Sequence, residues 1–362
     1  MKKINKNKMR LAIIFGGKSA EHEVSIKSAR NVIQALDKKK YNLVILGISK
    51  VGDWFQFEEA DMLSSKNVFA SKRKKAVTVY AEKNGMVVQN NSKKTKIEVV
   101  FPIIHGTFGE DGTLQGMLKA YGVPFVGSSI LGSAVGMDKD VAKRLMREAG
   151  IPVSKFLVYR KRQQDELSFE EIKKALSVPF FVKPANLGSS VGISKVKNKN
   201  DFSQAIKDAF AYDNKIIIEE AVVGKEIECS VMGNENPMAS VLGEIIPSHD
   251  FYSYKAKYLD KKGAITAIPA NIPKDVAKKI QALAIQTFEV LCCEGMGRVD
   301  FFLTNSNKIF VNEINTIPGF TSVSMYPKLW EQSEVAYSDL IDNLIDLAIE
   351  RHEMENKLRV SK

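Results

Sequence analysis

Residues 297–315, GRVDFFLTNSNKIFVNEIN, predict a two-stranded hairpin that carries its charged side chains on one face. A polar cluster separates two runs rich in aromatic and β-branched residues, as is typical of a turn between paired strands. Because successive side chains of a strand point to opposite faces, Arg298 shares a face with Asp300, and Glu313 shares one with Asn315. The other strand positions are mostly apolar, which favours strands inside a domain over a solvated ribbon.

Two interpretations fit the polar face of this hairpin. It could be a solvated, salt-bridged surface, which is the ordinary role of an acidic hairpin. It could also hold a hard cation, because Mg²⁺ prefers oxygen ligands and is usually held by one or two carboxylates together with phosphates. A turn centred on residues 305–306 would place Arg298 opposite Glu313. Asp300 would then lie diagonal to Glu313, close enough to share a ligand with it. The second interpretation predicts a metal site at Asp300, Glu313 and Asn315.

A candidate phosphate site follows an apolar strand expected at 178–183. Lys183 closes this strand, and the loop Gly188–Gly192, GSSVG, comes shortly after it. Backbone N–H groups and hydroxyls in such a loop suit a phosphate, although the same string also fits a plain turn. The spacing matches neither the P-loop nor the dinucleotide-binding fingerprint, so those two folds are disfavoured.

Alternating strands and amphipathic helices predict an α/β protein of more than one domain. Strands expected at 10–15 and 41–48 flank a helix whose apolar positions recur every four residues from Val24 to Leu36, which indicates a parallel sheet. Segment 60–98 is polar, and we expect irregular structure or an edge hairpin there. A short strand is expected at 123–126, and further helices at 113–121, 139–149, 201–210, 275–291 and 338–350. At 362 residues the chain is too long for one core. We expect an N-terminal unit at 1–126, a central lobe at 127–223 and a C-terminal lobe at 224–362.

Composition narrows the class of partner. The net charge is +11, and its lysine clusters could bind nucleic acid or simply form a solvated basic surface. No aromatic residues interleave with them, which favours the solvated surface and small anionic ligands such as nucleotides. No apolar run approaches the roughly 18 residues that cross a membrane, and no signal peptide is expected. Three cysteines without CxxC spacing predict a cytoplasmic protein, and the four scattered histidines suggest no histidine-based metal site. We therefore expect no nucleic-acid and no membrane partner.

Eight short motifs, in order, resemble the ATP-grasp superfamily and, within it, the D-alanine–D-alanine ligase family, over about residues 10–350. They are Phe15–Ser25 (FGGKSAEHEVS), His105–Gly112 (HGTFGEDG), Met137–Lys139, Val182–Pro184, Gly188–Gly192, Tyr254–Tyr258 (YKAKY), Gly297–Asp300 and Asn312–Gly319 (NEINTIPG). Each motif alone is weak, but their order is specific. The resemblance implies an ATP-grasp fold, in which an N-terminal parallel-sheet α/β domain precedes two α+β lobes that clasp ATP.

The resemblance also implies ATP and two Mg²⁺ or Mn²⁺ ions as cofactors. Asp300, Glu313 and Asn315 match the family's metal ligands, with Glu313 bridging the two ions. Lys139 and Lys183 match the lysines on the α- and β-phosphates, and Ser190 lies in the loop over the phosphates. The backbone of Glu220, Ala221 and Val222 would contact the adenine, and Glu226 the ribose. Glu219 and Lys257 complete the implied nucleotide site.

The substrate contacts follow in the same way. Glu21 would bind the ammonium of the first D-alanine, with His105 beside it. Arg298 and the Gly319 N–H would stabilise the oxygen of the tetrahedral intermediate, and Ser324 with the Met325 backbone would bind the carboxylate of the second D-alanine. Glu21, Ser189 and Tyr258 would form a closing set over the site. Family members often have leucine at the Met325 position, and a backbone contact tolerates that change.

The activity implied is the ATP-dependent joining of two D-alanines through an acyl phosphate, for peptidoglycan precursors, by a homodimer. Three alternatives stay open: a D-Ala-D-Ser or D-Ala-D-Lac ligase, another ATP-grasp carboxylate–amine ligase, and a nucleotide-binding module without turnover. The pair Lys257–Tyr258 favours an amine nucleophile, because the related D-lactate ligases usually lack it. A module without turnover would lack a metal ligand or a phosphate lysine, and none is missing.

Overall fold

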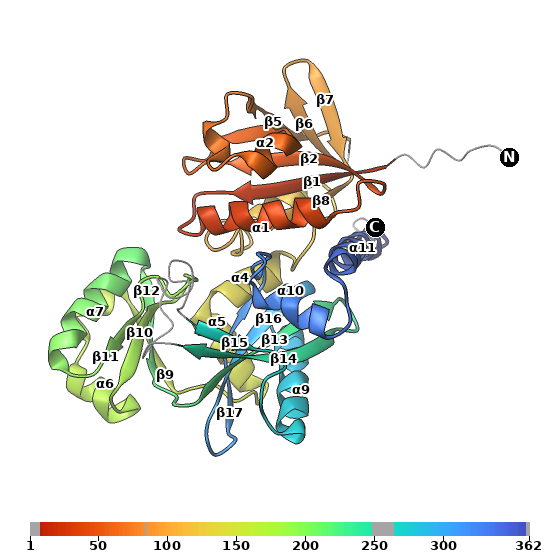
Figure 1. Ribbon diagram of the computed structural model, residues 1–362. Coiled ribbons are helices and arrows are strands. Elements are labelled where there is room, and N and C mark those ends of the chain that lie inside the picture. Colours follow the sequence, from red (N-terminus) through yellow and green to blue (C-terminus); the bar gives the residue numbers. More distant parts are fainter. Residues whose placement is uncertain (1–7, 84, 248–263, 360–362) are drawn as a thin grey trace.

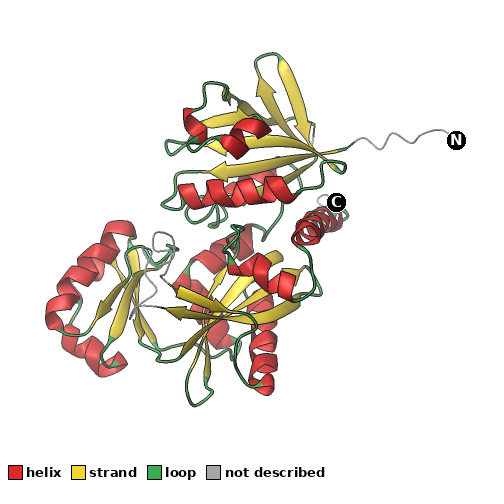
Figure 2. Cartoon of the chain, in the orientation of Figure 1, coloured by secondary structure: helices red, strands yellow, loops and turns green. Residues whose placement is uncertain are grey.

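The structure of the protein is a computed structural model that describes residues 8–83, 85–247 and 264–359. Four sheets are present in this part of the chain, and Figure 1 shows the first above the two other large sheets, which lie side by side. Figure 2 shows helices packed against each of these three layers. The mixed α/β fold expected from the sequence is confirmed.

The first sheet contains the parallel strands expected near the N-terminus. Its order is β4-β3-β2-β1-β8, formed by β4 (Lys75–Ala76), β3 (Trp54–Phe57), β2 (Tyr41–Ile48), β1 (Met9–Gly16) and β8 (Val99–Ile103). β1 pairs in parallel with both β2 and β8. The central strands are buried on both faces, as is usual for parallel strands covered by helices.

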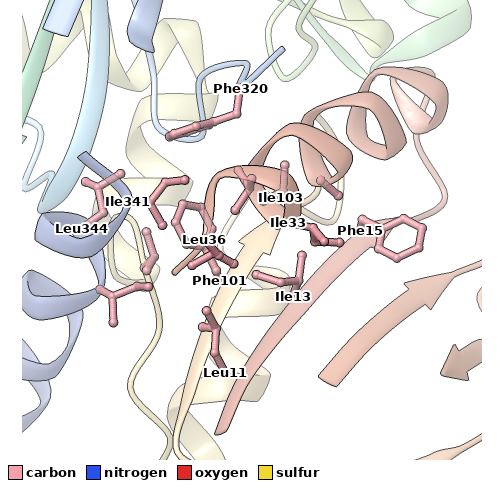
Figure 3. Close-up of a cluster of buried hydrophobic side chains, with 14 of the residues drawn as sticks. Leu11, Ile13, Phe15, Ile33, Leu36, Phe101, Ile103, Phe320, Ile341 and Leu344 are labelled. Atoms are coloured by element: carbon pink, nitrogen blue, oxygen red, sulfur yellow. The ribbon is translucent and has the colours of Figure 1, made fainter. Parts of the chain in front are cut away.

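Two helices far apart in sequence pack on the same face of this sheet, α1 (His22–Ala35) and α11 (Tyr337–Asn356). Leu11, Ile13 and Phe15 alternate along β1 toward that face, and Figure 3 shows them with Ile33 of α1 and Leu344 of α11. Segments near the two ends of the described chain thus pack against each other. The domain boundaries near residues 126 and 223 stay predictions.

The opposite face is covered by α3 (Thr113–Ala120) and by a small antiparallel sheet of β5 (Thr78–Ala81), β6 (Met86–Asn90) and β7 (Lys93–Ile97). Segment 60–98 is therefore more regular than expected, because Met86, Val88 and Ile97 bury apolar side chains between its lysines. α2 (Glu59–Ser64) and the 3₁₀ turn Val68–Ala70 precede the small sheet within this segment. The strand expected at 123–126 is reduced to one bridge between Val100 and Phe125.

The second sheet is antiparallel in the order β11-β10-β12-β9, formed by β11 (Ser194–Val196), β10 (Phe180–Pro184), β12 (Lys215–Glu220) and β9 (Phe156–Arg160). One face packs on α6 (Phe169–Leu176) and α7 (Lys199–Tyr212) through Phe180, Val182, Ile216 and Ile218. Lys183 and Glu219 alternate to the other face. A 3₁₀ turn, Lys161–Glu166, links β9 to α6.

The third sheet is antiparallel in the order β15-β14-β13-β16-β17. Its strands are β15 (Ala264–Ala267), β14 (Met238–Pro247), β13 (Lys225–Gly233), β16 (Gly295–Leu303) and β17 (Ile309–Asn315). Cys229, Val299 and Phe301 pack against α9 (Lys274–Val290) and α5 (Lys139–Glu148), which α4 (Ile130–Met137) precedes. α10 (Met325–Gln332) lies on the opposite face, beside β13 and β14. Because side chains alternate, Glu228 and Asp300 point to the same side as α10, where the candidate site lies.

Candidate active site

The β16–β17 hairpin carries the predicted polar face, but in another register than expected. Asp300 lies opposite Glu313, and Arg298 lies opposite Asn315, whereas a turn centred on residues 305–306 would have paired Arg298 with Glu313. The turn is centred later, and a bulge at Asn312 adds one more residue on β17. The later turn and the bulge each shift the pairing by one residue. Because side chains alternate faces with a period of two, a total shift of two residues leaves each side chain on the face predicted for it.

A row of carboxylates crosses three adjacent strands on this face. Glu228 of β13 pairs in register with Asp300 of β16, which pairs with Glu313 of β17. Arg298 binds two of them: its Nε and Nη2 donate to Asp300 at 2.7 and 2.8 Å, and Nε lies 3.0 Å from Glu228. Asn315 Nδ2 donates to Asp300 at 3.0 Å. Although burial alone would lower the pKa of Arg298, Asp300 and Glu228 raise it well above its ordinary value, so the guanidinium stays charged.

Lys139 connects this face to the residues just before the loop Gly188–Gly192. It is the first residue of α5, and Asp138 caps the helix by accepting from two backbone N–H groups. Its Nζ lies 3.0 Å from Glu313 Oε2 and donates to the Leu187 carbonyl at 2.9 Å. Burial alone would lower the pKa of Lys139, but the Glu313 carboxylate raises it. A permanent cation therefore stands beside the acidic row.

Lys183 belongs to a buried triad in the second sheet. Its Nζ lies 2.5 Å from Glu219 Oε2, and Lys143 Nζ lies 3.1 Å from Glu219 Oε1. Burial alone would raise the pKa of Glu219, but the two ammonium groups hold it down at about 2. Burial lowers the pKa of Lys143 against the pull of Glu219. Glu219 thus faces the two lysines with its side chain.

Two cavities adjoin at these residues and share Lys139, Gly188, Ser189 and Glu313. The smaller, of about 300 Å³, lies between the second and third sheets. All residues that were predicted to bind the nucleotide and that the structure describes line this cavity: Lys139, Lys183, Ser190, Glu219, Glu220, Ala221, Val222 and Glu226. The larger, of about 540 Å³, is lined by the substrate and metal-face residues Glu21, His105, Ser189, Arg298, Glu313, Asn315, Gly319, Ser324 and Met325. Tyr258 and Lys257 lie outside the described residues.

Glu21, at the start of α1, reaches the loop Gly188–Gly192. Ser189 Oγ donates to Glu21 Oε1, so two members of the predicted closing set are in contact. Gly106 packs against the Glu21 carboxylate as well. A Cβ on Gly106 would lie 2.6 Å from Glu21 Oε2, and the φ of Gly106 is +74°. A glycine is needed there both for space and for its backbone conformation.

His105 is buried and neutral. Burial lowers its pKa, and Nδ1 lies 2.9 Å from the Ile317 carbonyl, so Nδ1 carries the proton. Nε2 then accepts from Ser28 Oγ at 3.0 Å. Glu110 lies nearby and accepts from the backbone N–H groups of Gly106 and Ile317 at 2.8 and 3.2 Å. Burial, together with the charge of Glu21, raises the pKa of Glu110 to about 8.

Ser324 and Met325 mark the N-terminus of α10 and line the larger cavity. Ser324 Oγ accepts from Thr321 N–H at 2.9 Å, and a Cβ at Gly319 would lie 2.6 Å from the same oxygen. The first N–H groups of a helix attract anions, so this end of the cavity suits a carboxylate.

Comparison with known proteins agrees with this geometry. Family models described as D-ala D-ala ligase N-terminus and D-ala D-ala ligase C-terminus match residues 10–128 and 145–346. A D-alanine--D-alanine ligase of Oceanobacillus iheyensis is 52% identical, with 98% of this chain and 99% of that protein covered. The chain belongs to the D-alanine–D-alanine ligase family.

Solved structures of the family have the same fold. The D-alanine-D-alanine ligase from Coxiella burnetii superposes with a TM-score of 0.88 at 39% identity, covering 97% of this chain and 96% of that one. VanG D-Ala:D-Ser ligase from Enterococcus faecalis gives 0.85 at 37% identity, covering 94% and 100%. The ATP-grasp fold inferred from the motifs is thereby confirmed. No helix in the described part of the chain is long and apolar enough to span a membrane.

The donor atoms on the polar face of the β16–β17 hairpin show whether this face suits a metal ion. No three His, Cys, Asp or Glu residues converge as a metal cluster within the described ranges. Two carboxylates, Asp300 and Glu313, and the Asn315 amide nevertheless share one face, and Lys139 and Arg298 now neutralise the carboxylates. This set fits Mg²⁺ that takes its remaining ligands from phosphate oxygens and water.

Three residues beside the site were missed in the sequence. Glu228 lies two positions after Glu226, and the period-two pattern of β13 could have indicated it. Lys143 follows Lys139 by one helical turn on α5, so it shares its side of the helix. Glu110 stands inside the motif His105–Gly112, but nothing in the string shows that it contacts Ile317, which is distant in sequence.

Proposed function

We propose that this protein is an ATP-dependent D-alanine–D-alanine ligase that forms D-alanyl-D-alanine for peptidoglycan precursors. The observation that carries this proposal is the pair of joined cavities. The smaller is lined by Lys139 and Lys183 beside the loop Gly188–Gly192, and the larger is lined by the buried carboxylate Glu21 and by the N-terminus of α10. A polyanionic nucleotide and two zwitterionic amino acids are the ligands that this distribution of charge favours.

The chemistry divides into two displacement steps. A carboxylate oxygen of the first D-alanine attacks the γ-phosphorus of ATP and expels ADP, leaving an acyl phosphate. The neutral amine of the second D-alanine attacks the acyl carbon, and the tetrahedral intermediate expels phosphate. Mg²⁺ ions, when bound, would neutralise charge on the phosphates. The protein's contribution is mainly position and charge.

Individual residues have distinct parts in this proposal. Lys139 and Lys183 would hold the α- and β-phosphates, and Ser190 would contact them from the loop above. Asp300, Glu313 and Asn315 would hold two Mg²⁺ or Mn²⁺ ions, once the nucleotide draws Lys139 and Arg298 away from the carboxylates. Their cross-strand arrangement supports this role.

Both substrates would be oriented by residues that line the larger cavity. Glu21 would bind the ammonium of the first D-alanine, and Ser324 with the Met325 N–H would bind the carboxylate of the second. Arg298 and the Gly319 N–H would receive the negative oxygen of the tetrahedral intermediate. The family resemblance adds a homodimer and a cytoplasmic location, and light scattering of the purified protein tests the first of these.

The test compares acceptors. ADP release and product mass are measured with ATP, Mg²⁺ and D-alanine alone, and with D-serine or D-lactate added. We expect D-alanyl-D-alanine as the main product, with stoichiometric ADP and phosphate. Likeness to the VanG D-Ala:D-Ser ligase makes D-serine the second candidate acceptor. No turnover with D-alanine would contradict the proposal.

A further inference from the structure

The backbone of Ile317–Phe320, in the C-terminal lobe, is held at both ends by side chains of the N-terminal unit. At Ile317 the N–H donates to Glu110 at 3.2 Å, and the carbonyl accepts from His105 at 2.9 Å. At Phe320 the N–H donates to Ser28 Oγ at 3.2 Å. Ser28 in turn donates to His105, so two of the three side chains are connected.

Between these fixed ends, the Gly319 N–H has no hydrogen-bond partner among the residues that the structure describes. Pro318 has no N–H, so Gly319 offers the free donor of this turn, and it lines the larger cavity. Phe320 anchors the turn in the core, because its ring is fully buried. The ring packs edge-on against that of Phe101, with the two ring centroids 5.6 Å apart (Figure 3). An unpaired N–H held on a fixed backbone is the usual form of an oxyanion donor.

We infer that Ser28, His105 and Glu110 form a clamp whose role is to position the Gly319 N–H for the tetrahedral intermediate. The inference rests on the proposed function and adds to it two residues, Ser28 and Glu110, with no role in it so far. The three are positioning residues, because they act through the Ile317–Phe320 backbone. The same loop of the N-terminal unit also borders Glu21, through Gly106, so binding of the first D-alanine and placement of the donor depend on one element.

The clamp predicts unequal effects on the two chemical steps. Acyl phosphate formation needs the phosphate and metal residues but not the Gly319 N–H. Attack by the second amine needs that donor. Complete removal of one oxyanion donor typically lowers kcat by about 100- to 1,000-fold. A loosened donor should cost less, so we expect dipeptide formation to fall about tenfold or more in Ser28→Ala and Glu110→Gln.

The experiment measures both steps in the full-length enzyme. Oxygen-18 exchange between the bridging and non-bridging positions of labelled ATP reports reversible acyl phosphate formation, and D-alanyl-D-alanine reports the complete reaction. Ser25→Ala is the matched control, because Ser25 is equally buried on α1 but its hydroxyl bonds to the Ile103 carbonyl and the Gly16 N–H and not to the Ile317–Phe320 backbone. Melting temperature and the KM for ATP are measured in parallel.

We expect the ratio of exchange to dipeptide to rise about tenfold in Ser28→Ala or Glu110→Gln. The ratio in Ser25→Ala should stay unchanged. A ratio unchanged in both clamp variants, or raised equally in Ser25→Ala, would overturn the clamp. If Ser28→Ala does not fold, Glu110→Gln decides alone. Absence of both exchange and dipeptide in the wild-type enzyme would instead overturn the proposed function, and the clamp with it.

Discussion

Asp300 and Glu313 face each other directly across β16 and β17, one residue in register with the other. This places two carboxylates on neighbouring strands, closer than the diagonal arrangement that the hairpin sequence suggests. Such a pair is unfavourable without cations, and Arg298 and Lys139 supply them in the described structure. We propose that metal ions replace these side-chain cations when a nucleotide binds.

The first prediction concerns this pair. Glu313→Gln should lower kcat by about 100-fold or more, because an amide cannot replace the charge of a carboxylate that holds Mg²⁺ against phosphate. Steady-state ADP release at saturating Mg²⁺ measures the effect. Glu289→Gln, an exposed carboxylate on α9, is the control and should behave like wild type. Wild-type kcat in Glu313→Gln would exclude a metal role for this residue.

Lys139 should act mainly in nucleotide binding. We expect Lys139→Ala to raise the KM for ATP about 10- to 100-fold, the effect of losing one charge-assisted contact to phosphate. Initial rates over a range of ATP concentrations give this value. Lys278→Ala, which removes an exposed lysine of α9, controls for net charge. An unchanged KM for ATP in Lys139→Ala would mean that this lysine serves only to neutralise Glu313.

Ser324→Ala should weaken binding of the second D-alanine. The expected rise in its KM is about tenfold, because the variant removes a hydroxyl from the proposed carboxylate site at the start of α10. The KM for ATP should not change. Ser333, at the other end of the same helix, offers the matched control Ser333→Ala. Equal effects of the two variants would indicate helix destabilisation in place of substrate binding.

Glu219 should contribute to stability in a pH-dependent way. Its pKa in the folded protein is about 2, below the ordinary 4.5, because Lys143 and Lys183 surround it. Its stabilising effect is therefore complete above about pH 4.5 and is lost as the pH falls through about 2. Glu219→Gln should lower the free energy of unfolding by roughly 3–5 kcal/mol at pH 7, since two buried lysines lose their partner.

Denaturant titrations at pH 7 and pH 3 measure that difference, which should shrink at the lower pH. Glu220→Gln, on the next and more exposed position, should change the free energy of unfolding by less than about 1 kcal/mol. A pH-independent difference between Glu219→Gln and wild type would show that the ion pairs do not cause it.

The sequence predicted the elements of the fold better than their pairing. Strands and helices such as β1, α3 and α5 follow from apolar periodicity, which is local. The bulge at Asn312 depends on how β17 packs against β16, so the register of Arg298 and Asp300 could not be read from the string. The packing of α11 on the first sheet was missed for the same reason, because nothing local specifies a partner several hundred residues away.

The candidate site shows the same division. Residues within motifs, such as Lys139 and Lys183, could be chosen from the sequence because their motifs resemble a family. Lys143 and Glu228 share a face with such residues, but their contacts, between a helix and a sheet and between strands, could not be read from the sequence. Glu110 is the clearest case: its partner Ile317 is 207 positions away.

The most direct test of the central claim follows one oxygen atom. D-alanine labelled with oxygen-18 in its carboxylate is incubated with the enzyme, unlabelled ATP and Mg²⁺, and the products are weighed by mass spectrometry. If the carboxylate attacks the γ-phosphate, each D-alanyl-D-alanine formed releases one phosphate that carries one oxygen-18. Dipeptide formed with unlabelled phosphate, or no dipeptide at all, would contradict ligation through an acyl phosphate.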